Sequence, residues 1–78
     1  MVTEEDLRGW IEAGLKCSHL EVHGPDGVHF AALVVSAEFE DKSQIQRHQL
    51  VYRCLGAKMG NEIHALNLKT LTPDEWKQ

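Results

Sequence analysis

Three scarcities in the sequence narrow what the chain can do. Of its 78 residues only two are cysteines, Cys17 and Cys54, and they form no CxxC or zinc-knuckle spacing. Eight lysines and arginines stand against twelve aspartates and glutamates, so the basic surplus typical of non-specific nucleic-acid binders is missing. No apolar run approaches the ~20 residues that a membrane-spanning helix needs. We therefore expect two separate structural thiols and no membrane partner.

Catalytic motifs are missing as well. Ser43 has no GxSxG setting, no pair of carboxylates stands out, and no glycine-rich phosphate loop is present. A chain this short buries only ~60% of its unfolded surface, which leaves room for one small core and no deep substrate cavity. We expect a single domain over residues 1–78 that is not an enzyme. An acidic, polar stretch follows Met1 in place of a secretory signal, so we expect a cytoplasmic protein with reduced thiols.

The first half of the chain predicts a helix followed by a β-hairpin. Thr3 can cap a helix over residues 4–16, in which apolar residues recur at helical spacing: Leu7, Trp10, Ile11 and Leu15. His19–His23 alternates polar and apolar residues, which predicts a strand with one face in the core. Gly24–Gly27 is a turn signal. The nearly continuous apolar run from Val28 to Ala37 predicts a central strand buried on both faces.

The second half predicts helix, strand and a short final helix. Ser43 is the expected N-cap of helical sequence over residues 43–59, whose apolar stripe comprises Leu50, Val51, Cys54 and Leu55. Ile45 lies out of phase with this stripe, which favours a short helix followed by a longer one. Ile63 to Thr70 predicts the third strand, and Thr72–Glu75 is a capping box that opens a last turn. We expect Trp76 to fold back over the core.

The predicted order is α-β-β-α(α)-β-α, an α+β arrangement. Because the second and third strands are joined through helical sequence, a right-handed crossover would make them parallel. The first two strands form an antiparallel hairpin. We therefore expect a three-stranded mixed sheet with helices packed on it.

Histidines are the candidate ligands. His64 lies at the start of the third strand, on the same face as Leu66 and Leu68, and is either a hydrogen-bonded core residue or a metal ligand. His23 and His29 flank the hairpin turn and could approach each other. They are either surface histidines or half of a metal site, because two histidines lack the three or four protein ligands of a zinc site. A thiolate supplied by another protein would complete such a site.

Basic residues gather along the predicted middle helix. They are Lys42, Arg47, His48, Arg53 and Lys58. They would face either phosphate or an acidic partner, or they would form an ordinary solvated helix face. The overall net charge of −4 argues against strong phosphate binding.

Four motifs in the correct order resemble the BolA family, in particular its short BolA-like members. A strand, a turn and a His-Phe pair occupy Val22–Phe30, and the second motif, Val-Val-Ser followed by Phe-x-x-x-Ser, occupies Val34–Ser43. Arg-His-x-x-Val-Tyr matches Arg47–Tyr52. The last motif combines Ile-His-Ala-Leu at Ile63–Leu66 with Thr-Pro-x-x-Trp at Thr72–Trp76.

The resemblance implies a BolA-like fold, similar to a type II KH domain, and a non-catalytic adaptor role. Family members pair with monothiol glutaredoxins and share a 2Fe-2S cluster across the interface, with sulfur ligands from the glutaredoxin cysteine and from glutathione. The BolA partner supplies the histidine that corresponds to His64 and a second ligand from the loop between the first two strands. That loop holds no cysteine here, so we expect His29 as second ligand, with His23 in reserve. We expect the isolated chain to bind no cluster. We also expect it to be a monomer or a weak homodimer.

The resemblance also implies an alternative, because family members have been described as DNA-binding transcription regulators. Lys42, Arg47, His48, Arg53 and Lys58 would then contact the nucleic acid. One departure from the family pattern bears on this alternative, since Asp41 stands where the family usually has glycine. Aspartate tolerates turn conformations, so we expect the loop to survive, but its charge disfavours a phosphate contact near Lys42.

Overall fold

The computed structural model describes residues 2–60, 63 and 65–77. Its helices are α1 (Glu4–Gly14), α2 (Gln44–Leu55) and α3 (Pro73–Lys77), and its strands are β1 (His19–His23), β2 (His29–Val35) and β3 (Ala65–Leu71). Short 3-10 turns at Ala37–Phe39 and Gly56–Lys58 precede and follow α2. No helix among these residues is long and apolar enough to cross a membrane.

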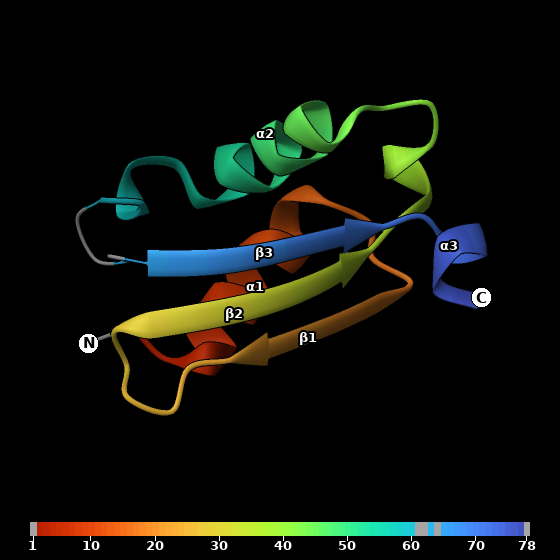
Figure 1. Ribbon diagram of the computed structural model, residues 1–78. Coiled ribbons are helices and arrows are strands. Elements are labelled where there is room, and N and C mark those ends of the chain that lie inside the picture. The colour runs from red at the N-terminus through yellow and green to blue at the C-terminus, as the bar shows by residue number, and fades with distance from the viewer. Residues whose placement is uncertain (1, 61–62, 64, 78) are drawn as a thin grey trace.

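The three strands form one sheet in the order β1-β2-β3. β1 is antiparallel to β2, with His23 opposite Ala31, and β2 is parallel to β3, with His29 opposite Ala65. α1 lies behind the sheet, α2 runs along its β3 side, and α3 sits at the end where β2 and β3 finish (Figure 1). The predicted element order and mixed sheet are thereby confirmed.

Local sequence explains where the two main helices begin. The Thr3 hydroxyl accepts a hydrogen bond from the Asp6 amide while the Asp6 carboxylate accepts one from the Thr3 amide, and Ser43 and Gln46 form the same capping box at α2. Both helices turn their apolar stripes to one face of the sheet. The buried cluster there is made mainly by Leu7, Ile11, Leu20, Val22, Phe30, Ala32, Val34, Phe39, Val51, Leu55 and Ile63.

The prediction that β2 is buried on both faces is wrong. Ala31 and Leu33 are only half-buried, and Val28, which precedes the strand, is 42% exposed. The register places both half-buried residues beside outward-facing neighbours, since Glu21 lies opposite Leu33 and Asn67 opposite Ala31. In the described part of the chain no helix covers this outer face (Figure 1). Because Ala31 and Leu33 are apolar, the sequence does not show that buried and half-buried residues alternate along most of β2.

Element boundaries differ from the predicted ones in the second half of the chain. One continuous helix, α2, follows Ser43, and within the predicted range of residues 43–59 the short helical turn, Gly56–Lys58, comes after the long helix. Ile45 lies within α2 and is 72% exposed, so its position out of phase marks a solvent-facing residue and no break. The third strand begins at Ala65 instead of Ile63, because Ile63 forms only an isolated bridge with Met59.

Trp76 does not cover the core. Its side chain is 42% exposed, and its ring stacks on the imidazole of His19, with ring centroids 4.7 Å apart and an interplanar angle of 18°. The contact ties α3 to the first residue of β1. A large aromatic ring is stabilised by stacking at a surface as well as by burial. The place of Trp76 in the sequence therefore did not show which of the two it would do.

Candidate functional site

The loop between β1 and β2 is held from both sides. The Gly24 amide donates to the Glu4 carboxylate of α1 at 2.6 Å, and the Gly27 amide donates to the Gly24 carbonyl at 3.1 Å. Gly27 has a φ of 72°, which favours glycine. The loop is therefore a defined turn anchored to the first turn of α1.

Asp26 organises the residues that leave this turn. Its Oδ1 accepts the amides of Val28 and His29 at 2.9 and 2.8 Å, and its Oδ2 lies 2.9 Å from His29 Nδ1. The hydrogen bond from the His29 ring, followed by those of the two amides, holds the pKa of Asp26 well below its usual range. Sequence reasoning missed Asp26, although an aspartate that begins a turn commonly accepts amides two and three residues ahead.

His29 presents an accessible imidazole. Its side chain is 72% exposed, and only Nδ1 is paired, with Asp26. Within the described residues Nε2 makes no hydrogen bond. The ring therefore offers one free nitrogen at the start of β2, the central strand of the sheet.

His23 is in a different setting. Its Nε2 lies 3.8 Å from one oxygen of Glu21, whose other oxygen is 2.7 Å from His19 Nε2. The hydrogen bond from His19 is the main reason that the pKa of Glu21 is lowered. The register places His23 opposite Ala31, two residues beyond His29, so the hairpin does not pair the two histidines directly.

The predicted ligand His64 lies outside the described residues, and its role stays a prediction. Ala65, the residue after it in the sequence, is the register partner of His29 across the parallel β2–β3 pair. No group of three or more histidine, cysteine, aspartate or glutamate residues suited to a metal ion occurs in the described part of the chain. An imidazole donor fits a metal or cluster that takes its remaining ligands from elsewhere.

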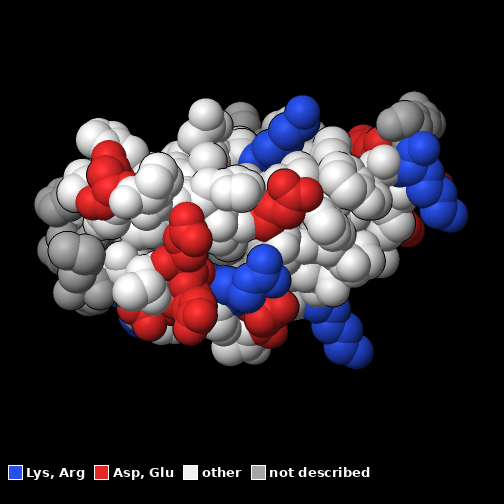
Figure 2. Space-filling view, turned by 90° about the horizontal axis from the view of Figure 1, so that it is seen from below, with Lys and Arg blue, Asp and Glu red and all other residues white. Residues whose placement is uncertain are grey.

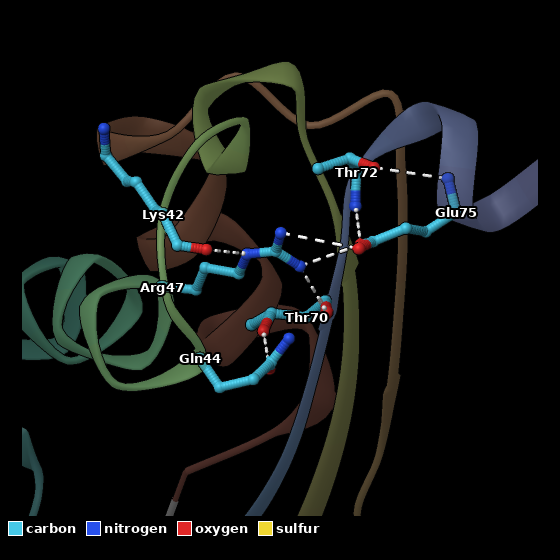
Figure 3. Close-up of polar contacts among 6 residues, drawn as sticks. All are labelled: Lys42, Gln44, Arg47, Thr70, Thr72 and Glu75. Atoms are coloured by element: carbon cyan, nitrogen blue, oxygen red, sulfur yellow. Dashed lines mark hydrogen bonds and ion pairs between the residues drawn. The ribbon is translucent and has the colours of Figure 1, made fainter.

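Arg47, one of the predicted nucleic-acid contacts, is buried and engaged. Its side chain is 8% exposed, and Nη1 donates to a Glu75 oxygen at 2.8 Å. Nε donates to the Lys42 carbonyl at 3.0 Å, and a longer contact of 3.4 Å reaches the Thr70 carbonyl. Figure 3 shows the guanidinium between the N-terminal end of α2 and the start of α3. Arg47 is therefore a structural residue, and its burial argues against a direct contact with nucleic acid.

The other basic residues make separate contacts. The His48 ring meets Tyr52 edge-on at 6.3 Å, and Lys58 Nζ lies 4.6 Å from the centre of the Trp10 ring. Lys42 and Arg53 line the same surface hollow of about 380 Å³, which Asp41 also lines. Asp41 has a φ of 63°, so aspartate does adopt the turn conformation expected of it in place of glycine.

Charged side chains are unevenly spread over the face seen in Figure 2. Acidic side chains gather over the half nearer the β1–β2 turn, and lysine and arginine side chains are prominent at the opposite end.

Neither cysteine is in a setting that favours a thiolate. Burial, followed by the nearby Glu12 carboxylate, raises the pKa of Cys17 to about 11, and burial also raises the pKa of Cys54. Both are free and half-buried. Cys17 follows α1 and Cys54 lies on α2, away from the β1–β2 loop in sequence and fold.

Comparison with known proteins assigns the family. A family profile described as BolA-like protein matches residues 11–75. The chain is 42% identical to human BolA-like protein 2, over 96% of this chain and 91% of the relative. It also resembles the DNA-binding transcriptional regulator BolA of Haemophilus influenzae, with 45% identity over 63% of this chain and 48% of that protein. The structure of a BolA homologue from Coxiella burnetii superposes with a TM-score of 0.82 at 46% identity, covering both chains completely. The chain belongs to the BolA family.

Proposed function

We propose that this protein is a non-catalytic adaptor that pairs with a monothiol glutaredoxin and co-ligates a 2Fe-2S cluster with it. The partner and the cluster in this proposal are those that the family resemblance implies. The observation that supports the proposal in this chain is the His29 ring, which is 72% exposed with Nδ1 paired to Asp26 and Nε2 unpaired among the described residues.

His64 and His29 would be the two ligands from this chain. Glutaredoxin and glutathione would supply the thiolates, which agrees with a chain whose own cysteines have raised pKa values. His29 is a better candidate than His23, because the Nε2 of His23 already faces Glu21. Imidazole in place of thiolate makes a cluster less negative and raises its reduction potential.

The test is to mix the protein with cluster-loaded monothiol glutaredoxin and glutathione and to record visible circular dichroism. We expect a spectrum distinct from that of the glutaredoxin alone, lost or altered in His64→Ala and in His29→Ala. His23→Ala is the matched control, since it removes a similarly exposed histidine on the same hairpin. Identical spectra for the wild type and both ligand variants would refute the assignment.

Nucleic-acid binding is the second candidate, and it rests on the Haemophilus relative, which is described as a DNA-binding transcriptional regulator. Lys42 and Arg53, which share one hollow, would be the main contacts, with His48 and Lys58 as further candidates. Affinity for duplex DNA should then fall steeply with salt, and a Lys42→Ala, Arg53→Ala double variant should flatten that dependence. A salt-independent or undetectable association would exclude this candidate.

A further inference from the structure

The β1–β2 loop contains a carboxylate whose position determines which nitrogen of His29 is available. Asp26 uses its two oxygens differently. Oδ1 accepts the backbone amides of Val28 and His29, which fixes the turn, whereas Oδ2 faces His29 Nδ1 at 2.9 Å. One side chain thus shapes the loop and also holds the ring that the loop carries.

The chemistry of the pair fixes the tautomer. An ionised carboxylate can only accept hydrogen bonds, so in the neutral imidazole Nδ1 must carry the proton. The lone pair then lies on Nε2, the nitrogen that is unpaired among the described residues and points away from Asp26. A neutral ring with a free lone pair is the form in which histidine binds a metal.

We infer that Asp26 is a positioning residue: it holds His29 as the Nδ1-protonated tautomer, so that Nε2 is the ligand atom presented to iron. This inference rests on the proposed function, because His29 must be a ligand. A carboxylate behind a ligating histidine orients the ring and increases its basicity. Asp26 itself would not touch the cluster.

Asp26→Asn is the most informative variant. The turn can persist, while the donor and the acceptor in the hydrogen bond to His29 Nδ1 exchange roles. The amide oxygen can still accept the Val28 and His29 amides as Oδ1 does. The amide nitrogen then takes the place of Oδ2 and can only donate, so Nδ1 must accept and the proton moves to Nε2. Asp26→Ser is the companion variant, because its hydroxyl can cap the turn but leaves Nδ1 to water.

The first measurement is made on the metal-free protein. Two-bond proton–nitrogen correlation spectra of ¹⁵N-labelled protein, recorded at mildly alkaline pH, distinguish the two tautomers of each neutral ring. His29→Ala assigns the His29 signals. We expect the Nδ1-protonated form in the wild type, the Nε2-protonated form in Asp26→Asn and a mixture in Asp26→Ser. An Nε2-protonated ring in the wild type would overturn the inference, whatever the cluster does.

The second measurement is made on the complex with cluster-loaded monothiol glutaredoxin and glutathione. We expect Asp26→Asn to retain the cluster about 10- to 100-fold less tightly against a chelator. The variant should also weaken the ¹⁴N hyperfine coupling of the reduced cluster toward that of His29→Ala. Unchanged amide spectra outside the loop show that the fold is intact.

The remaining outcomes distinguish a failure of the positioning role of Asp26 from a failure of the ligand role of His29. If Asp26→Asn inverts the tautomer but binds the cluster like wild type, while His29→Ala does not, the positioning role is wrong and the proposed function stands. If His29→Ala also behaves like wild type, His29 is not a ligand, and both the inference and this part of the proposed function fail.

Discussion

Arg47 and Glu75 lie 28 residues apart in the sequence and meet in an ion pair of 2.8 Å. The Glu75 oxygen that accepts from Arg47 Nη1 also accepts the Thr72 amide at 2.8 Å, and the Thr72 hydroxyl accepts the Glu75 amide (Figure 3). The capping box of α3 is thereby joined to α2. Two family motifs that look separate in the sequence form one structural unit.

We predict that Arg47→Ala lowers the free energy of unfolding by about 1–3 kcal/mol, because the Lys42 and Thr70 carbonyls and the Glu75 carboxylate lose the guanidinium donor. Urea denaturation followed by circular dichroism measures the change. Arg53→Ala, an exposed arginine on the same helix, is the control and should stay within about 0.5 kcal/mol of wild type. Equal effects of the two substitutions would contradict the structural role of Arg47.

Glu75 should make stability depend on acid. The hydrogen bond from Arg47, followed by that of the Thr72 amide, lowers the pKa of Glu75 from its ordinary value of 4.5. A lowered folded-state pKa stabilises the protein above the unfolded-state pKa, and this contribution is lost as the pH falls through the folded-state pKa. When the pH is lowered from about 4.5, the melting temperature should therefore drop less in Glu75→Gln than in the wild type. Asp74→Asn, one residue away in α3, is the matched variant that removes a carboxylate without removing the partner of Arg47.

Gly24 and Gly9 make a matched pair of glycine-to-alanine substitutions. A methyl group at Gly24 would overlap the ring of Phe30, whereas one at Gly9 in α1 meets nothing within 4 Å. We expect Gly24→Ala to destabilise the protein by about 1–3 kcal/mol through overpacking. Gly9→Ala should stabilise it by about 0.5–1 kcal/mol through helix propensity. Thermal unfolding compares the two, and a Gly24→Ala variant as stable as the wild type would refute the account of Gly24.

Cys17 should alkylate slowly. A pKa of about 11 in place of 9.0 leaves a thiolate fraction at neutral pH on the order of 100-fold smaller than that of a free thiol. The iodoacetamide rate of Cys17 in a Cys54→Ser background should keep rising with pH up to about 11. A rate that levels off near pH 9 would show that burial does not protect this thiol. If the proposed function holds, Cys17→Ser and Cys54→Ser should both leave the circular dichroism spectrum of the glutaredoxin mixture unchanged.

Local patterns predicted most of the fold. The capping boxes at Thr3, Ser43 and Thr72 are contained in four-residue stretches, and the alternation of His19–His23 matches its burial. Such signals are readable because cause and effect lie within one turn or one strand. The parallel pairing of β2 and β3 also followed from the helical connection between them.

Contacts between distant segments were not predictable in the same way. No local pattern indicates that Arg47 turns inward to Glu75, or that Trp76 stacks on His19. The basic stretch therefore looked like a surface until its partners were known. Asp26 is the exception among the residues that were missed, since its distance of three residues from His29 in a turn sequence was a usable signal.

The two ends of the chain emerge at opposite ends of the molecule, with the N-terminal end beside the β1–β2 turn and the C-terminal end beyond α3 (Figure 1). Val2 is packed in the core cluster, and Glu4 holds the Gly24 amide. A fusion partner or dye placed before Val2 would therefore crowd the loop that carries His29. Attachment after α3 leaves that loop accessible, which makes the C-terminal side the better place for labels in pull-down, energy-transfer or surface-immobilisation assays.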